Sequence, residues 1–394
     1  MRIISFMNVS NLNNLSTDSG YKFYDILADE FISSGHEFIF VGPAPLRCTK
    51  AGFIPFDFGS NKYEFRFNFN IEIVSAIIGS ADPDIIMVNQ VELVPHFCIC
   101  LEVLGNITAR VVTYAHYIPF SLDQQGFLHA DSSLNARGLN EVIKHAFFSG
   151  MEMAELVFLH STFARDYIVI SAQQTGRKVD LHKFVIVPPP RDENLYVDFP
   201  VVSDNREILY NHRLYEHYGA EYLVQLIPSL TAIGANITIL DILGSRTAKR
   251  RALDHSPDIL RARLKSYSDV RVIENGAFGF EYRSIIQGTR FALAPMRPNC
   301  TWSMSCIDCM AMGKPVLAPD IAWFREFIPV ELLFSDGEEA SEIAYRLLYD
   351  DVFYKEMALA CSLRTRHLSS NTIARLFIKE FLKLKENIHA DRVT

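Results

Sequence analysis

The sequence predicts an α/β protein made of two doubly wound, Rossmann-like domains, and three observations support this fold class. Short apolar segments of strand length alternate with segments of helical apolar spacing, which is typical of parallel sheets covered by helices. The alternation runs twice along the chain. A polar, Pro-rich segment at 188–206 separates the two series, as domain linkers commonly do. We therefore predict domains at 1–195 and 196–375, and a C-terminal helix at 376–394 with the option of packing back on the first domain.

Composition and charge indicate a globular protein without a strongly basic surface. The 394 residues are 49% hydrophobic and 21% charged, which is ordinary globular composition with enough length for two cores. The net charge of −8 lowers the expectation of a polyanion partner without excluding a local basic groove. Seven cysteines without a regular framework indicate reduced thiols. The start of the chain lacks the pattern of a signal peptide, and no apolar run approaches the roughly 20 residues of a membrane span. We expect a soluble, cytoplasmic protein.

The first series of elements begins with a strand at 2–9, a polar loop and a helix at 21–34, whose apolar residues recur at three- and four-residue spacing. Residues 61–73 alternate aromatic and polar side chains, so we predict a strand with one buried face there, in preference to a base-stacking surface. A further helix is expected from 163. The remaining strands of this series are predicted at 38–41, 85–88, 111–114, 156–159 and 184–187.

The second series follows the Pro-rich segment with the same alternation. Its strands are predicted at 207–210, 237–243, 270–273, 291–294 and 315–317, with helices between them. Two consecutive series of this kind argue for two parallel sheets. Because ligands of such sheets bind outside the carboxyl ends of the strands, the loops at those ends are the candidate binding loops.

Three residues near strand ends of the first domain are candidates for ligand contacts. Ser19 and Gly20 precede the first helix, where Gly20 would let backbone approach a ligand closely, although a plain tight turn fits equally well. His116 follows the strand at 111–114 and is placed to donate to a substrate oxygen. A satisfied core histidine is the alternative for His116.

One acidic pair resembles a metal site only superficially. Asp82 and Asp84 could hold a divalent cation through carboxylate oxygens. They flank Pro83 and precede a strand instead of following it, so we interpret them as part of a turn. No metal site is predicted.

The stretch from 291 to 327 is the most informative part of the chain. An apolar strand, a polar loop, a helix of small and apolar residues, a Gly313-Lys314-Pro315 stop and a second strand form a βαβ unit. The loop leaving the first strand and the N-terminus of the next helix direct free N–H groups and the helix dipole to one point. The pattern predicts that residues 299–305 bind a phosphate-bearing ligand.

Five segments lie along the chain at 19–37, 154–163, 208–219, 308–316 and 333–350. In this order they resemble segments of the GT-B-fold glycosyltransferases, and most closely the retaining nucleotide-sugar family called glycosyltransferase group 1, or GT4. The similarity covers nearly the whole chain. Residues 308–316 resemble the family's Glu-Ala-Met-Ala-x-Gly-x-Pro-Val, and 208–219 resemble the strand and loop that carry its phosphate-binding arginine and lysine.

The resemblance implies a nucleotide-sugar donor, a UDP- or GDP-sugar, on the second domain and an acceptor on the first. It implies transfer of a hexosyl or pentosyl group, with retention, no metal and no further cofactor. Arg213 would be the catalytic cation on the leaving phosphate, a role that a guanidinium fork suits, together with His116. Asp308 would accept from the ribose hydroxyls, and Ser19 and Gly20 would also face the donor. The remaining donor loop would be Thr301, Trp302, Ser303, Met304 and Ser305.

The chain departs from the family's pattern at three places. The family has two glutamates eight positions apart, and here those positions hold Cys300 and Asp308. Its Gly-Phe-Gly loop is replaced by residues 301–305, whose hydroxyls can join the N–H groups on the phosphate. The lysine expected five residues after Arg213 is Tyr218. These departures affect the donor sugar, and a sugar-nucleotide-binding module without activity is therefore an alternative function.

The acceptor is left open by the sequence. A glycan or a lipid-linked sugar is common for the family, whereas a hydroxymethylated base in phage-type DNA or an RNA nucleoside is an alternative from the same fold. Tyr117 and Arg137, together with Arg66 and Lys144, keep a nucleic-acid acceptor under consideration. No obligate protein partner is inferred. A contact with an anionic membrane surface through the basic run at 249–251 is a further option.

Cys306 and Cys309 match a C-x-x-C pattern. Zinc requires about four ligands, and this half of the chain has no second pair. We interpret these cysteines as small buried helix residues.

Overall fold

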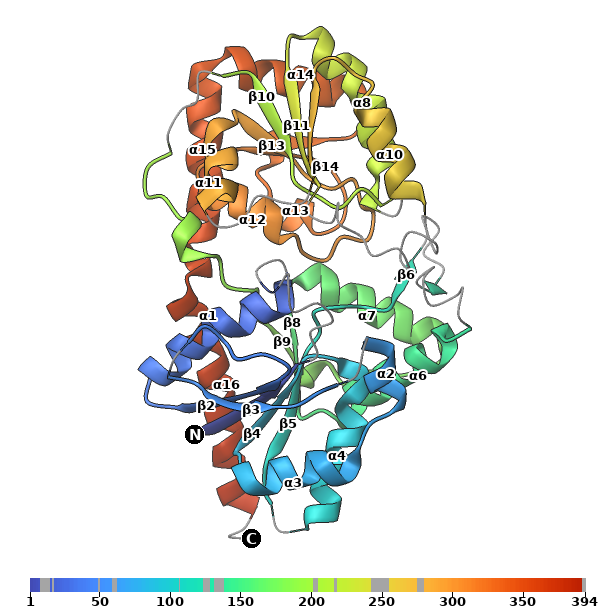
Figure 1. Cartoon of the computed structure of the whole chain (residues 1–394), viewed down its shortest axis with the longest axis vertical. Coiled ribbons are helices and arrows are strands. Elements are labelled where there is room, and N and C mark those ends of the chain that lie inside the picture. Colours follow the sequence, from blue (N-terminus) through green and yellow to red (C-terminus); the bar gives the residue numbers. More distant parts are fainter. Residues whose placement is uncertain are drawn as a thin grey trace. The chain divides into compact units, whose positions relative to one another are not determined.

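The computed structural model describes residues 1–7, 15, 18–48, 50–58, 62–105, 107–122, 128–130, 138–200, 205–215, 218–241, 255–274 and 280–391. These residues form two compact units. The first comprises Met1–Pro190 and Ser370–Thr394, and the second comprises Arg191–Ser369. Each is an α/β unit with a parallel sheet between helices (Figure 1). The arginines at 246, 250 and 251 and Lys249 lie outside the described residues.

The first unit contains a seven-stranded sheet in the order β3-β2-β1-β4-β5-β8-β9. Every pair of neighbouring strands is parallel. The strands are β1 (Arg2–Phe6), β2 (Glu37–Gly42), β3 (Gly52–Pro55), β4 (Ile85–Val88), β5 (Arg110–Tyr114), β8 (Leu156–Leu159) and β9 (Phe184–Ile186). An antiparallel hairpin, β6 (Phe120–Leu122) and β7 (Leu128–Ala130), is separate from this sheet.

The helices of the first unit follow the strands in the expected alternation. They are α1 (Ser19–Ser33), α2 (Lys62–Phe67), α3 (Ile71–Ala81), α4 (Val94–Leu104), α6 (Asn140–Met153), α7 (Thr162–Gln174) and α16 (Ser370–Asp391), with short 3-10 turns at Val91–Leu93 (η2) and Leu181–Lys183. The predicted helices at 21–34 and from 163 are confirmed as α1 and α7. Ser161 caps α7, because its hydroxyl accepts from the Ala164 N–H at 3.0 Å.

The strand predicted at 61–73 is wrong, because the structure has α2 and the start of α3 there. A strand would place Phe65 and Phe67 on the same face, yet Phe65 is buried and Phe67 is 52% exposed. Asn70 then caps α3 by accepting from the Ile73 N–H at 3.0 Å. The other predicted strands of this unit are confirmed with small differences in their bounds, and residues 8 and 9 of the strand predicted at 2–9 lie outside the described residues.

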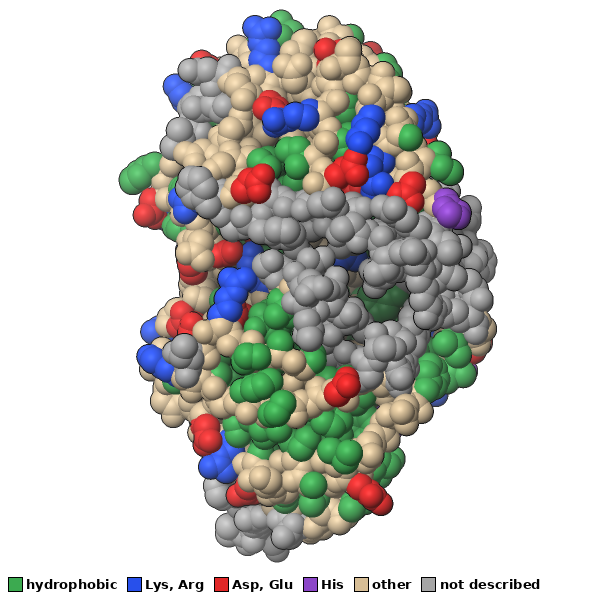
Figure 2. Space-filling view, viewed as in Figure 1, with side chains coloured by type: hydrophobic (Ala, Val, Ile, Leu, Met, Phe, Trp, Pro, Cys, Tyr) green, Lys and Arg blue, Asp and Glu red, His purple; other side chains and the backbone are tan. Residues whose placement is uncertain are grey.

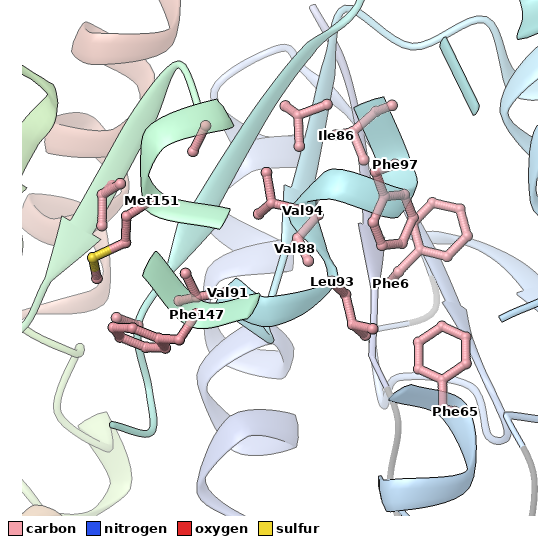
Figure 3. Packing of buried hydrophobic residues seen from close by; sticks show 14 of the residues in the cluster. Phe6, Phe65, Ile86, Val88, Val91, Leu93, Val94, Phe97, Phe147 and Met151 are labelled. Carbon is pink, nitrogen blue, oxygen red and sulfur yellow. The ribbon is translucent and has the colours of Figure 1, made fainter. Parts of the chain in front are cut away.

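A large hydrophobic core lies between the sheet and the helices α3, α4 and α6 (Figure 3). Phe6 of β1 packs on Phe97 of α4 with ring centroids 4.8 Å apart. Gly150 lets α6 approach the backbone of η2 closely, since a Cβ there would lie 1.9 Å from the Val91 carbonyl oxygen. The close contact requires glycine at this position.

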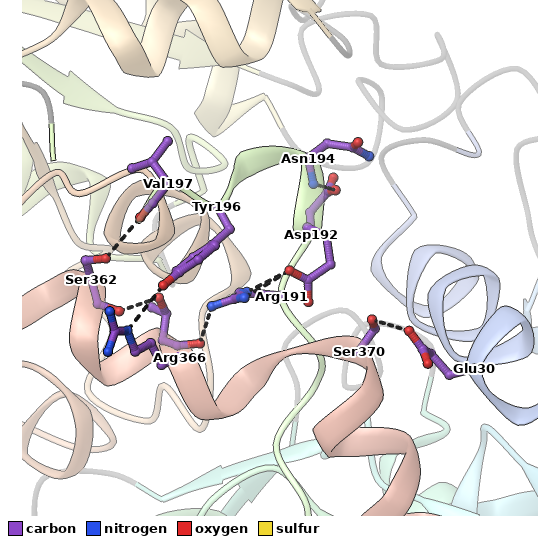
Figure 4. A network of polar contacts seen from close by, with 11 residues as sticks. Glu30, Arg191, Asp192, Asn194, Tyr196, Val197, Ser362, Arg366 and Ser370 are labelled. Atoms are coloured by element: carbon purple, nitrogen blue, oxygen red, sulfur yellow. Dashed lines mark hydrogen bonds and ion pairs between the residues drawn. The ribbon is translucent and has the colours of Figure 1, made fainter. Parts of the chain in front are cut away.

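The C-terminal helix α16 belongs to the first unit and packs on α1. Phe377 lies in an aromatic cluster, 4.6 Å from Phe158 and 5.9 Å from Phe23 between ring centroids. The helix begins where Ser370 donates to Glu30 at 2.7 Å (Figure 4). Further along, Lys385 pairs with Asp84 at 2.9 Å.

Asp82 and Asp84 serve the structure of this unit. Asp84 also accepts from the Arg2 N–H at 2.8 Å, and these contacts lower its pKa despite the opposing effect of burial. Asp82 ends α3 in the left-handed conformation, with φ of 44°. The interpretation of this pair as part of a turn fits these contacts.

The second unit contains a six-stranded parallel sheet in the order β12-β11-β10-β13-β14-β15. Its strands are β10 (Glu207–Tyr210), β11 (Asn236–Asp241), β12 (Val270–Glu274), β13 (Phe291–Leu293), β14 (Val316–Pro319) and β15 (Leu333–Phe334). Its helices are α8 (Ala220–Ala232), α10 (Ser256–Leu264), α11 (Phe280–Gly288), α12 (Met304–Ala311), α13 (Phe324–Phe327), α14 (Gly337–Tyr349) and α15 (Asp351–Thr365), with 3-10 turns at Glu193–Leu195, Val330–Leu332 and Arg366–Leu368. The predicted strands of this series are confirmed with small differences in their bounds, and residues 242 and 243 of the strand predicted at 237–243 lie outside the described residues.

The segment that enters the second unit is attached to the end of α15 (Figure 4). Arg191 is buried, donates to the Thr365 carbonyl at 3.0 Å, and lies 3.3 Å from the ring centroid of Tyr196. Ser362 donates to the Val197 carbonyl at 3.3 Å. These contacts hold both ends of this unit together, because the chain leaves it just after α15.

Candidate donor site

Two neighbouring loops at the carboxyl end of the second sheet are in contact. One follows β10 and begins with Asn211, and the other follows β13 and leads to α12. Strands β10 and β13 are parallel neighbours, so both loops leave the same edge. They touch at Gly219, which has φ of 75° and where a Cβ would lie 2.3 Å from the Met296 carbonyl oxygen. Only glycine fits this contact without a shift of the backbone.

The N-terminus of α12 is linked to the β10 loop through a buried histidine. Ser303 caps the helix by accepting from the Cys306 N–H, as the sequence pattern of a polar loop before a helix requires. Ser305, in the first turn, lies 2.7 Å from Nδ1 of His212. Burial lowers the pKa of His212 to about 3, against the opposing effect of the Leu293 backbone. The imidazole is therefore neutral near pH 7, and it joins the two loops without adding charge.

Asp308, on the same helix, is buried in a network of side chains from three elements. The Tyr282 hydroxyl of α11 donates to Oδ2 of Asp308 at 3.0 Å, and Nδ2 of Asn211 lies 2.9 Å from that hydroxyl. Burial and the neighbouring carboxylate raise the pKa of Tyr282 well above its ordinary value. Asn211 is 2% exposed, and its Oδ1 accepts no hydrogen bond from the described residues. The network fixes the position of Asp308 at this edge of the sheet.

Arg213 follows His212 on the β10 loop, and its side chain is exposed. No carboxylate in the described ranges forms an ion pair with it. An exposed guanidinium at this place is available to an anionic ligand.

The predicted loop 301–305 is partly apolar in its contacts. The Trp302 ring packs on Trp323, with centroids 4.6 Å apart, and its Nε1 lies 3.1 Å from the sulfur of Met304. Cys300 is buried and its thiol donates to the Trp302 carbonyl at 3.5 Å. Burial raises the pKa of Cys300 to about 11, so it is a neutral thiol where the resembled family has a carboxylate. Thr301, half-buried, precedes this packing.

The candidate residues of the first unit follow strands β1 and β5, at the carboxyl end of its sheet. The N–H of Gly20 is paired, because it donates to the capping carboxylate of Asp18 at 3.1 Å, and Ser19 is the first residue of α1. The ring of His116 packs on Tyr114 and Phe23, with centroids 4.3 and 4.5 Å away.

The predicted acceptor residues differ in their surroundings. Tyr117 is 43% exposed, and Arg137 lies outside the described residues. Arg66 is paired with buried Glu92, and Lys144 pairs with Glu141 at 2.7 Å. Arg66 is therefore part of a buried ion pair in this structure.

The first unit also has a cavity and an apolar surface. The cavity, about 250 Å³, is lined by Phe56, Asn68, Asn70 and their neighbours beside α2 and α3. Hydrophobic side chains gather on the face over α3 and α4 (Figure 2), where Ile73, Ile99 and Val103 are exposed.

Neither a metal cluster nor a membrane span is present in the described parts of the chain. Those parts contain no group of three or more His, Cys, Asp or Glu side chains able to hold a metal ion. None of the described helices is long and apolar enough to cross a bilayer. Cys306 and Cys309 are both buried free thiols on α12.

Sequence reasoning missed four residues of the candidate site. Asn211 and His212 could have been selected, because they directly follow a predicted strand. Arg297 lies on the loop after the predicted strand at 291–294 and could have been selected on the same ground, whereas its contact with Tyr218 could not be foreseen. Tyr282 carried no comparable signal, since its contact with Asp308 joins two different helices.

Two parallel α/β units in tandem are the plan of the GT-B fold, and comparison with solved structures confirms the predicted fold class and the resemblance to GT-B glycosyltransferases. No family model and no curated protein sequence matches the chain. Sucrose-phosphate synthase from Thermosynechococcus elongatus matches with a TM-score of 0.73 and 15% identity, covering 98% of this chain and 99% of that one. HepE from Anabaena, in complex with UDP-glucose, matches with a TM-score of 0.69 and 14% identity over 97% of this chain and 100% of that one. A glycosyltransferase from Rickettsia africae matches with a TM-score of 0.66 and 14% identity, covering 98% of this chain and 99% of that one. At these identities the likeness establishes the fold.

Proposed function

We propose that the protein is a glycosyltransferase that moves a sugar from a nucleotide-sugar donor to an acceptor hydroxyl, with retention and without a metal. One observation carries the proposal. Exposed Arg213, the N-terminus of α12 and buried Asp308 all belong to elements at the carboxyl end of β10 and β13 in the second unit. The complex of the structurally similar HepE with UDP-glucose supports a uridine diphosphate sugar as donor. A GDP-sugar is the other candidate.

Each of these groups has a distinct task in the proposed reaction. Asp308 accepts from the ribose hydroxyls, and the N-terminus of α12 receives a phosphate through its free N–H groups and dipole. Arg213 stabilises the negative charge that develops on the leaving diphosphate, which is the largest electrostatic requirement of the transfer. Ser303 and Ser305 add hydroxyl donors at the same helix end.

The bond changes need no dedicated general base. The bond between the anomeric carbon and the diphosphate oxygen breaks, and the acceptor oxygen forms a new bond to that carbon on the same face. The acceptor proton passes to the leaving diphosphate oxygen, so the diphosphate leaves protonated and charge is conserved. His116 and Tyr117 of the first unit, with Ser19 and Gly20, are proposed to line the path of the acceptor and the donor sugar. A glycan, a lipid-linked sugar and a modified nucleic acid are the acceptor classes to screen.

A second function, a nucleotide-sugar-binding module without turnover, is favoured by one specific observation. Cys300 is a buried neutral thiol where the resembled family has a glutamate that holds sugar hydroxyls. Binding of the nucleotide without transfer to any acceptor would favour this second function.

The experiment is a rate measurement on Arg213→Ala. Loss of a cation that stabilises the leaving group is expected to lower turnover by roughly 10²- to 10³-fold. Arg271→Ala is the matched control, because Arg271 is an exposed arginine of the same unit that pairs with Glu207, the first residue of β10. Equal rates for the Arg213 and Arg271 variants would remove Arg213 from the site.

A further inference from the structure

Arg297, on the loop after β13, is a cation held by two contacts, and no carboxylate among the described residues neutralises it. Its guanidinium carbon lies 5.0 Å from the ring centroid of Tyr218, and its Nε donates to Oδ1 of Asn299 at 2.8 Å. The two terminal nitrogens of Arg297 donate to no acceptor in the described parts of the chain. No described carboxylate forms an ion pair with it either. Two contacts therefore position the guanidinium, while its two terminal nitrogens stay available to a ligand.

This cation lies beside the loop that carries Arg213. Tyr218 is on the β10 loop, five residues after Arg213, and is followed by Gly219. Gly219 in turn touches the backbone of Met296, the residue before Arg297. The contact of the two loops thus brings the arginine of one loop over the tyrosine of the other.

Cys300 stands where the resembled family has a carboxylate, so position 300 supplies no negative charge to Arg297. Arg297 is close enough to Cys300 to act on its pKa, yet burial dominates and keeps the thiol neutral. A glutamate at position 300 would place a negative charge beside the guanidinium. In this chain the loop carries a positive charge without that counter-charge.

We propose that Arg297 is the second cation of a nucleoside diphosphate site, acting with Arg213 on the two phosphates. This inference rests on the proposed function and adds a residue to it. Tyr218 occupies the position at which the resembled family has a lysine, and its ring instead orients a guanidinium supplied by the neighbouring strand's loop. The site is therefore selective for the diphosphate, and the nucleoside alone gains nothing from Arg297.

The test measures affinities for UDP, GDP and the matching nucleosides by calorimetry, using the full chain. Arg297→Gln is expected to lower the affinity for the preferred nucleoside diphosphate by about 10- to 100-fold, because a charged hydrogen-bonding group is lost. The affinity for the nucleoside is expected to stay unchanged. Arg297→Lys keeps the charge without the fork, so its loss is expected to be smaller. Arg271→Gln is the control for general loss of surface charge, and thermal unfolding checks that each variant is folded.

A rescue variant tests whether a positive charge at the contact of Tyr218 and Arg297 is what binds the diphosphate. Tyr218→Lys, added to Arg297→Gln, places a cation on the other loop and is expected to restore part of the diphosphate affinity. If Arg297→Gln binds the diphosphate as the unaltered protein does, or loses nucleoside and diphosphate affinity equally, Arg297 is not a phosphate ligand. If the unaltered protein binds no nucleoside diphosphate, the proposed function itself fails and this inference fails with it.

Discussion

Replacing Gly219 by alanine tests the contact that joins the two loops of the candidate site. The residue has φ of 75°, and an added Cβ would lie 2.3 Å from the Met296 carbonyl oxygen and 2.6 Å from its carbon. The left-handed conformation costs a non-glycine residue roughly 1–2 kcal/mol. Overpacking against backbone adds about 1–3 kcal/mol. We therefore expect Gly219→Ala to lower the free energy of unfolding of the second unit by about 2–5 kcal/mol.

The matched control is Gly234→Ala in the same unit. Gly234 has φ of 83°, and the nearest atom to its added Cβ is the side-chain hydroxyl of Tyr349 at 3.0 Å, a contact that a shift of a few tenths of an ångström relieves. Only the conformational cost of roughly 1–2 kcal/mol is expected there. Urea unfolding of both variants measures the difference, and nucleotide affinity reports whether the loops have shifted. Equal destabilisation by the two substitutions would refute the close contact between Gly219 and Met296.

Three further predictions concern the ribose ligand, pH and metals. Asp308→Asn is expected to weaken nucleoside binding by about 10-fold in calorimetry, since it removes a charged acceptor, and unchanged affinity would exclude Asp308 as the ribose ligand. The pKa of His212 is about 3 in the folded chain and 6.5 when exposed, so the unfolded chain binds more protons between these values. The free energy of unfolding should then fall as the pH falls below about 6.5, and this residue contributes up to about 1.4 kcal/mol per pH unit. His212→Asn should lessen that pH dependence. An unchanged pH dependence in this variant would contradict the burial of a neutral His212. EDTA is expected to leave transfer intact, whereas loss that a divalent cation reverses would show that a metal takes part.

Much of the fold could be predicted from local patterns. The strand at 85–88 is a continuous apolar run, and the helix at Ser19–Ser33 has clear apolar periodicity, so both were predicted correctly. The segment 61–73 misled the prediction, because alternating aromatic residues also occur where a short helix buries one ring and exposes another. Phe65 packs on Phe58 with ring centroids 4.3 Å apart, a tertiary contact that the local alternation of residues does not reveal.

The candidate site was predictable only where its residues follow strands or match the family's pattern. Arg213 and Asp308 were selected in this way. The partner of Asp308, Tyr282, lies on another helix, and no spacing in the sequence links them. Arg297 meets Tyr218 only because β10 and β13 are neighbours in the sheet, although two other strands lie between them in sequence. Such contacts follow from the sheet order, which local patterns do not determine.

The most direct test of the central claim is thermal unfolding of the protein with UDP, GDP, ADP, the matching nucleosides and the nucleotide-sugar conjugates. A ligand at 100 times its dissociation constant stabilises the folded state by about 2.7 kcal/mol, so a specific donor nucleotide should raise the melting temperature measurably. We predict a selective rise with one base, larger for the diphosphate than for the nucleoside, that Arg213→Ala diminishes. The absence of a shift with every nucleotide and conjugate would contradict the assignment of a nucleotide-sugar site to the second unit.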